Sequence, residues 1–403
     1  MQVSIVDFDE LPVHDTTWSL NAGPDRRAYV AACCEHLGGV AAVIVRYSPD
    51  GKREPLIDMG EASGQPADNG RATQCKIHYS LILDPDGIMY AATHLSGPPL
   101  GHVVYNPWGN WGDPHVSFAG AALVVYDTKK DEMLWSDFLY PQEGCRCLAL
   151  DLQRRRLYSV TYPLDHFHMY ELDERRDTDY GRIGAVNPQA VWLDPHGNAY
   201  TTDDWGQVLR FDADAQRLEA LDRFLPHPPF DNGWHHMVYD VVALPGEPTK
   251  VVGVAWAAWP HLWLYDMAEG DQGQMIDLGP FHPDATGHEP NCMNRTHVGG
   301  LVFGPDGLLY YSIMSEHDPQ RGIISHLRRL DLSTGEHEEL GPLHDPVRDE
   351  YAPYVSRAVW LSPRDLILGL VMRVPTGIAH VRFEEGELAD RADPDFPELR
   401  LWG

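Results

Sequence analysis

Short apolar segments separated by tight polar turns recur along the whole chain. Four segments show an apolar run, a turn of the Asp-Pro-Asp-Gly type and a second apolar run: LILDPDGIMYAAT from Leu81, VWLDPHGNAYTT from Val191, LVFGPDGLLYYSI from Leu301 and VWLSPRDLILGL from Val359. Three looser copies begin at Ser19, Leu148 and Val241. Apolar runs bounded by proline, glycine and aspartate predict antiparallel strands joined by tight turns.

The seven copies are spaced like repeats of one structural unit. Their turns begin 43 to 67 residues apart, at Gly23, Asp84, Asp151, Asp194, Ala243, Gly304 and Ser362. Sustained helical periodicity is almost absent. Repeats of this length with four strands each are typical of propeller blades. The sequence therefore predicts an all-β protein, a single domain of residues 1–403 folded as a seven-bladed β-propeller of four-stranded antiparallel blades.

Two further patterns support this prediction. A third apolar segment follows several of the turns and ends at an acidic residue, as in LVVYDTKKDE from Leu123 and QVLRFDADAQ from Gln207. Aspartate at the end of a strand favours a turn, because its side chain hydrogen-bonds to nearby backbone. Residues 3–6 are expected to supply the outer strand of the last blade, which would close the ring and cover an exposed edge.

Composition narrows the class of function. The 403 residues carry 60 acidic and 31 basic side chains, a formal charge of −29, which disfavours nucleic acid as a partner. The first residues resemble no signal peptide, and the apolar runs are too short to span a bilayer. The spacing of the six cysteines suits neither a disulfide scaffold nor a paired-CxxC zinc site. These features predict buried thiols in a reducing cytoplasm.

Counting back from each turn selects residues expected at one radius, because the innermost strand of each blade lines the central channel. Seven positions before the turns lie Thr16, Ile77, Gly144, Asn187, His236, His297 and Val355. Five positions before them lie Trp18, Tyr79, Arg146, Gln189, Val238, Gly299 and Arg357. His78 and His235 lie one residue from these registers. The channel is therefore expected to contain histidines, a glutamine and two arginines.

This set has two interpretations. Neutral imidazoles can hold a divalent metal while arginines bind a carboxylate, or the polar groups can simply hydrogen-bond to one another in a water-filled channel. His236 is preferred to its neighbour His235, because adjacent strand residues point to opposite faces and His236 shares its register with His297. The preceding loop, residues 281–300, adds the polar side chains His282, His288, Glu289, Asn291, Asn294 and Arg295.

Two insertions also carry candidate binding residues. The segment from His94 contains Tyr105, Trp108 and Trp111, aromatic residues that stack on sugar rings, cover a core or form a dimer contact. The segment from Thr161 contains Tyr162, His166 and His168. His166 and His168 share one face of a strand, which suits either a metal site or a solvated outer surface.

A seven-bladed propeller with histidines and a glutamine at its axis resembles the oligogalacturonate lyases and related propeller polysaccharide lyases. The resemblance spans nearly the whole chain and is architectural. It implies a metal bound by several histidines and a glutamine, and cleavage of uronic-acid sugars by β-elimination. His236, His297 and Gln189 match that ligand pattern in kind.

The hypothesis assigns a role to each candidate. A divalent metal, with manganese, calcium and zinc equally compatible, is expected at His236, His297, Gln189 and His288. Substrate binding is assigned to Arg146, Arg357, Arg295, Trp108 and Trp111. His78 is the expected base, and Tyr79 or Tyr162 is expected to protonate the leaving oxygen. The predicted enzyme is a carbon–oxygen lyase acting on a small anionic oligosaccharide.

Two alternatives remain open at this point. A glycoside hydrolase or a sugar lactonase can use the same site, with the metal polarising a carbonyl. A non-catalytic binding or scaffold propeller requires no chemistry there.

Overall fold

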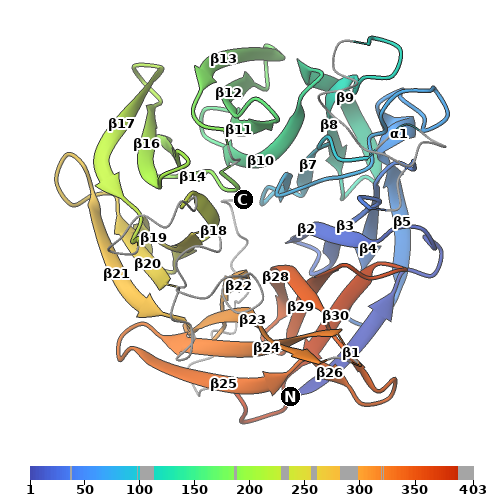
Figure 1. The fold of residues 1–403 in the computed structure, drawn as a ribbon, viewed down its shortest axis with the longest axis vertical. Coiled ribbons are helices and arrows are strands. Elements are labelled where there is room, and N and C mark those ends of the chain that lie inside the picture. The colour runs from blue at the N-terminus through green and yellow to red at the C-terminus, as the bar shows by residue number, and fades with distance from the viewer. Residues whose placement is uncertain are drawn as a thin grey trace.

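The computed structural model consists almost entirely of antiparallel strands arranged as a ring of sheets (Figure 1). It describes residues 1–36, 39–97, 99, 113–185, 188–227, 236–255, 261–281, 298–318, 320 and 322–388. The chain is a seven-bladed β-propeller, and the predicted fold class is confirmed. Each blade has four antiparallel strands, with the first strand nearest the axis and the fourth at the rim (Figure 1).

The blades follow one another in chain order around the ring. The first blade contains β2 (Thr16–Ala22), β3 (Ala28–Cys33), β4 (Val43–Tyr47) and β5 (Arg53–Asp58). The second contains β6 (Leu81–Leu83), β7 (Ile88–Ala92), β8 (Gly120–Asp127) and β9 (Glu132–Pro141). The third contains β10 (Gly144–Asp151), β11 (Arg156–Tyr162), β12 (His166–Glu171) and β13 (Arg176–Arg182).

The remaining blades repeat this order. The fourth contains β14 (Trp192–Leu193), β15 (Ala199–Thr202), β16 (Gln207–Asp212) and β17 (Arg217–Phe224). The fifth contains β18 (Val238–Leu244), β19 (Glu247–Ala255), β20 (His261–Asp266) and β21 (Gln274–Pro280). The sixth contains β22 (Val298–Phe303), β23 (Leu309–Asp318), β24 (Gly322–Asp331) and β25 (Glu336–Pro342). The seventh contains β28 (Tyr354–Ser362), β29 (Asp365–Val371), β30 (Gly377–Arg382) and β1 (Gln2–Asp7).

Short elements complete the described structure. A small hairpin of β26 (His344–Asp345) and β27 (Glu350–Tyr351) precedes the seventh blade, and the short helix α1 (Met59–Ala62) follows the first. No described helix has the length and apolar character needed to cross a membrane. The five cysteines in the described residues are buried and form no disulfide.

All seven predicted turns join the first and second strands of a blade. In the second blade the Asp84 carboxylate accepts the Ile88 amide at 2.8 Å, and Gly87 adopts φ +82°, a conformation that favours glycine. The aspartates that end third strands act in the same way, since Asp127 accepts the amides of Lys129 and Lys130 at 3.0 Å. Both turn signals seen in the sequence therefore have a hydrogen-bonding cause.

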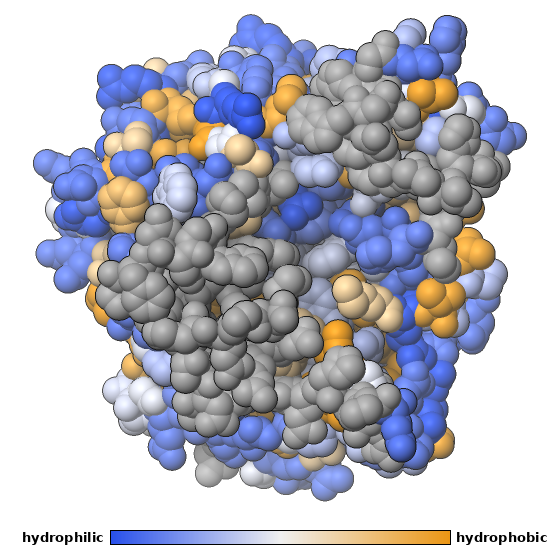
Figure 2. All heavy atoms as spheres, viewed as in Figure 1, coloured by the Kyte–Doolittle hydropathy of each residue, from blue (hydrophilic) through white to orange (hydrophobic). Residues whose placement is uncertain are grey.

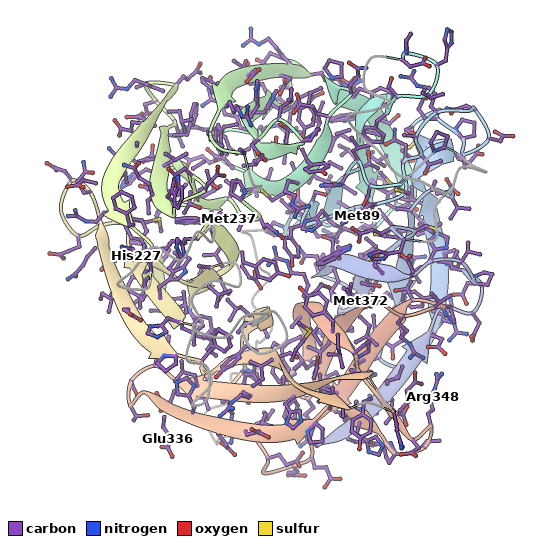
Figure 3. All side chains as sticks on the ribbon, viewed as in Figure 1. Met89, His227, Met237, Glu336, Arg348 and Met372 are labelled. Carbon is purple, nitrogen blue, oxygen red and sulfur yellow. The ribbon has the colours of Figure 1, made fainter. Side chains whose placement is uncertain are left out.

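The core lies between neighbouring blades. Side chains alternate along each strand, so the two faces of a blade pack against the blades before and after it. Phe167 of the third blade packs against Phe211 of the fourth, and Trp192 of the fourth against Trp263 of the fifth. Hydrophilic residues dominate the described rim (Figure 2). In Figure 3 the labelled Glu336 and Arg348 lie on this rim.

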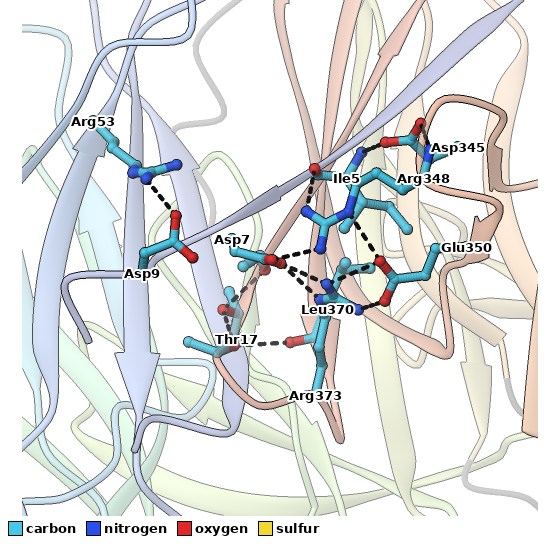
Figure 4. A network of polar contacts seen from close by, with 12 residues as sticks. Ile5, Asp7, Asp9, Thr17, Arg53, Asp345, Arg348, Glu350, Leu370 and Arg373 are labelled. Carbon is cyan, nitrogen blue, oxygen red and sulfur yellow. Dashed lines mark hydrogen bonds and ion pairs between the residues drawn. The ribbon is translucent and has the colours of Figure 1, made fainter. Parts of the chain in front are cut away.

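The N-terminal strand closes the ring as predicted. β1 pairs antiparallel with β30 from Gln2↔Arg382 to Asp7↔Gly377. Polar side chains reinforce this pairing (Figure 4). The Asp345 carboxylate accepts the Ile5 amide at 2.8 Å, and Arg348 donates to the Asp7 carboxylate at 2.6 Å. Strands from the two ends of the chain are thus joined by charged groups as well as by backbone.

Asp7→Asn should lower the free energy of unfolding by about 2 kcal/mol at pH 7, because the charged hydrogen bonds from Arg348 and Arg373 would lose their acceptor charge. Asp9→Asn is the matched control. The Asp9 side chain is 68% exposed, and its ion pair with Arg53 should contribute less than about 1 kcal/mol. Urea unfolding monitored by tryptophan fluorescence measures the free energy of unfolding of both variants.

The effect should depend on pH with a defined sign. Burial alone would raise the pKa of Asp7, but hydrogen bonds and charges of Arg373 and Arg348 outweigh it and lower that pKa. The stabilisation is therefore present at neutral pH and is lost as pH falls below about 4. If the free energies of unfolding of wild type and Asp7→Asn differed by the same amount at pH 7 and at pH 3, this account would be contradicted.

Candidate functional site

The register predicted at the axis gathers residues from several blades. Trp18 and Tyr79 approach with ring centroids 6.2 Å apart, and the Arg357 guanidinium lies 3.9 Å from the centre of the Tyr79 ring. The Tyr79 amide donates to the Arg146 carbonyl at 3.1 Å. Residues five positions before the turns in the first, second, third and seventh blades are therefore neighbours.

A buried polar network crosses the axis. The Tyr79 hydroxyl donates to the Tyr239 hydroxyl at 2.9 Å, and Tyr239 hydrogen-bonds to Tyr354, so phenols from the second, fifth and seventh blades meet. Arg357 forms an ion pair with the fully buried Asp240. Burial raises the pKa of Tyr79 to about 12. The phenols of this network hydrogen-bond to one another, and Arg357 is ion-paired with Asp240. The roles predicted for Tyr79 and Arg357 toward a substrate stay predictions.

A second group of polar side chains lies between the first and second blades. Lys76 is buried and pairs with the Glu35 carboxylate at 2.5 Å, and its ammonium lies 4.7 Å from the centre of the Trp18 ring. The Trp18 indole N–H also donates to Glu35. Burial alone would raise the pKa of Glu35, but Lys76 outweighs it and lowers that pKa. Lys76 and Glu35 therefore form a charged pair whose charges cancel locally.

His78 is held as a neutral imidazole between these groups. Its ring stacks on Trp18 at 4.9 Å, and Nδ1 lies 3.1 Å from the Arg146 carbonyl oxygen. Because a carbonyl only accepts, Nδ1 donates and the lone pair lies on Nε2. Burial, followed by the charges of Arg146 and Lys76, lowers the pKa of His78 well below its usual value. His78 therefore has the electronic state of a base at neutral pH.

Arg146 is a partly buried cation at the start of the third blade that forms no ion pair with a carboxylate of the described residues. Its Nη1 donates to Nε2 of His94 at 3.1 Å, and its buried Nε has no hydrogen-bond partner among the described residues. His94 in turn stacks on Tyr162 at 5.0 Å. The Arg146 charge therefore stays uncompensated among the described residues, within a protein whose total charge is strongly negative.

The chain paths explain why these residues meet. An isolated antiparallel bridge pairs Lys76 with His94, and a parallel bridge pairs Tyr79 with Cys147 at the start of the third blade. Lys76 and His78 are two residues apart in this extended segment and so share a side. The segment between the first two blades thus brings one cation and one imidazole beside Arg146. We refer to Glu35, Lys76, His78, His94, Arg146 and Tyr162 as the basic cluster.

The predicted metal ligands lie partly outside the described residues. Gln189 is buried, and its backbone N–H donates to the Val238 carbonyl at 2.9 Å. Its side-chain Oε1 accepts no hydrogen bond from a described residue. His236 is buried, and its amide donates to the Asp204 carbonyl at 2.9 Å. Five of the predicted site residues lie outside the described residues: His288, Arg295, His297, Trp108 and Trp111.

Sequence reasoning missed three members of the basic cluster and one of the axial network. Lys76 had a usable signal, because it precedes His78 by two residues and alternation places both on one side. His94 opened an insertion that was singled out for its aromatic residues alone. Glu35 and Asp240 gave no such signal, because each finds its cation through contact with another repeat.

The fold and this axial arrangement define the class of protein as a β-propeller with a largely buried basic cluster beside the inner strands of its second and third blades. No protein-family model matches the chain, and no curated protein matches its sequence. Solved structures do match.

The chain is similar to the WD40 repeats of RRP9, with a TM-score of 0.54 and 9% identity over 95% of this chain and 98% of that one. It is similar to streptogramin B lyase, with a TM-score of 0.55 and 10% identity over 95% of this chain and 97% of that one. It is also similar to a fungal alcohol oxidase of the AA5 family in complex with copper. The TM-score is 0.59, with 13% identity over 98% of this chain and 78% of that one.

Identities this low show the fold alone. The three matches are a set of WD40 repeats, a lyase and an oxidase, so the shared architecture does not select an activity. None of them is an oligogalacturonate lyase, and the finer resemblance stays a prediction.

Proposed function

We propose that the protein is a carbon–oxygen lyase that cleaves a small uronic-acid-containing oligosaccharide by β-elimination at the basic cluster. The observation that carries the proposal is Arg146, a partly buried guanidinium without a carboxylate partner in the described chain. An uncompensated cation at a partly buried position favours an anionic ligand, and the planar guanidinium matches a carboxylate.

The chemistry follows from the neighbours of Arg146. Nε2 of His78 takes the proton from the carbon next to the substrate carboxylate. The electron pair of that C–H bond forms a C=C bond to the adjacent carbon, and the C–O bond at that carbon breaks. Arg146 stabilises the negative charge that develops on the carboxylate. Burial raises the pKa of Tyr162, which keeps its proton available for the leaving oxygen.

A divalent metal belongs to this proposal as an additional source of positive charge. Among the described donors, Gln189 fits a ligand role, because its buried Oε1 accepts no hydrogen bond there. His236 would supply an imidazole from the next blade, and the other predicted ligands lie outside the described residues. When bound, the ion would polarise the substrate carboxylate.

Ultraviolet absorbance of the unsaturated uronate product tests the proposal. The full chain is incubated with oligomers of galacturonate, glucuronate and mannuronate, with and without chelator. We expect an absorbing product from at least one oligomer, and about a 100-fold or greater loss of rate in His78→Gln. A saturated product would indicate hydrolysis instead. That result, or binding without any product, would refute the lyase.

The pH dependence gives a second readout of the same base. Because the pKa of His78 lies well below its ordinary value of about 6.5, the base stays unprotonated as pH falls through that value. kcat/KM should therefore stay level between pH 8 and pH 6 and decline only at lower pH. An acid limb centred near pH 6.5 would assign the base to another histidine.

A further inference from the structure

The outer half of the third blade carries a second cluster of histidines and acids, made of residues that the lyase proposal does not use. His166 and His168 lie on β12, and Asp179 lies on the neighbouring β13. One ligand atom from each of the three lies within 4.8 Å of the others. In the described part of the chain, no other three His, Cys, Asp or Glu side chains meet in this way.

Pairing of the two strands produces this arrangement. His168 lies opposite Asp179, and the register shifts between His166 and His168. His166 Nδ1 lies 2.8 Å from Asp179 Oδ2, and His168 Nε2 lies 3.9 Å from Asp179 Oδ1. The rings of the two histidines are stacked with centroids 6.2 Å apart. The Asp179 carboxylate therefore lies within reach of both imidazoles.

His168 is the residue that distinguishes the cluster from a surface ion pair. It is only 4% exposed, and its Nδ1 lies 2.8 Å from the Asp177 carboxylate. That carboxylate accepts, so Nδ1 carries the proton and Nε2 the lone pair. Nε2 is buried and has no hydrogen-bond partner in the described structure. A carboxylate on one imidazole nitrogen and an open lone pair on the other is the arrangement found behind metal-ligating histidines.

Other blades provide an internal comparison. In the fifth blade His261 pairs with Asp277 at 2.7 Å, and in the sixth His326 pairs with Glu339 at 2.8 Å. In both blades a third-strand histidine pairs with a fourth-strand acid, as His166 does with Asp179, and in the sixth blade Arg328 also pairs with Glu339 at 3.4 Å. A histidine–carboxylate pair is thus a recurrent structural feature of these blades. The third blade alone among these three adds a buried second imidazole.

We propose that His166, His168 and Asp179 form a binding site for a first-row transition metal ion such as Zn²⁺ on the rim of the third blade. Two imidazoles and one carboxylate suit such an ion, and water would complete a tetrahedron. Ligand atoms around tetrahedral zinc are roughly 3.3 Å apart, so 3.9 Å requires only small side-chain rotations. Asp177 acts as a positioning residue that orients His168.

Titration of the metal-free full chain with Zn²⁺ against a chelating indicator tests the site. Wild type should bind one equivalent of Zn²⁺ at this site. In His168→Ala the affinity for that equivalent should be at least about 100-fold lower. Asp177→Asn, which leaves all three ligands in place, should weaken binding roughly 10-fold to 100-fold. His261→Ala is the matched control, because it breaks the equivalent pair in the fifth blade and should leave Zn²⁺ affinity unchanged.

Two further measurements distinguish loss of this site from misfolding and from metal binding at the proposed axial site. His166 has a 25% exposed side chain, so His166→Ala should fold normally by circular dichroism and still lose the same equivalent. Co²⁺ should give visible absorption bands of a tetrahedral nitrogen–oxygen site in wild type and not in His166→Ala. Zn²⁺ binding that is unchanged in both His166→Ala and His168→Ala would overturn the proposal, as would the absence of any bound equivalent.

Discussion

Replacing Arg146 with methionine should lower kcat/KM on a responsive uronate oligomer roughly 100-fold to 1000-fold. Methionine keeps much of the length of the side chain but removes the charge and the hydrogen bond to His94. The substrate carboxylate would then have no fixed cation as negative charge develops on it. Arg146→Lys should retain part of the activity, because a lysine supplies charge without the planar fork. Initial rates over a range of substrate concentrations measure both variants.

The same variant should change the titration of His78. The Arg146 charge is the largest contribution after burial to the lowered pKa of His78. Its removal should therefore raise that pKa and move the acid limb of the rate profile to higher pH. A residue that only maintained local packing would reduce activity without such a shift.

Arg154→Met is the matched control. Arg154 lies in the turn after β10, at the other end of the strand that carries Arg146, and pairs with Asp151 and the exposed Asp214. Its loss should change stability by about 1 kcal/mol or less and leave kcat/KM unchanged. If Arg146→Met and Arg154→Met retained similar activity, the assignment of Arg146 to the substrate carboxylate would be wrong.

The fold was predictable because its determinants are local. Asp84 and Asp127 hydrogen-bond to backbone within four residues, so the turn signal is complete within a short segment. Alternating apolar residues between the turns then fix which side of each strand faces the next blade. Closure by residues 3–6 followed from the requirement that no edge be left open, and the pairing of β1 with β30 confirms it.

The site was only partly predictable because its determinants are not local. Counting from the turns placed Trp18, Tyr79, Arg146 and Arg357 at one radius, since equivalent positions in blades share a distance from the axis. The same count cannot reveal which charges cancel. Arg357 is balanced by Asp240, 117 positions earlier, whereas Arg146 finds no acid in the described chain. Only three-dimensional contacts separate the structural arginine from the one available to a ligand.

Asp240→Asn should destabilise the protein by about 3–5 kcal/mol, a larger effect than that expected for Asp7→Asn. Asp240 is fully buried, and its two oxygens accept from Arg357 and from the amides of Val241 and Leu301. Asparagine removes the charge and replaces one accepting oxygen with an NH₂ group. That group would face another donor, and the Arg357 charge would be left buried without a partner.

The double variant Asp240→Asn/Arg357→Met decides between loss of a charge pair and loss of packing. If the unpaired guanidinium causes the damage, removing it should recover at least about 1 kcal/mol relative to the sum of the single changes. Asp277→Asn on β21 of the same blade is the control, with a 46% exposed side chain and an expected cost below about 1 kcal/mol. Urea unfolding midpoints of the wild type, the two single variants, the double variant and the control measure these effects. Strictly additive losses would mean that Asp240 stabilises the axis through its backbone contacts rather than through Arg357.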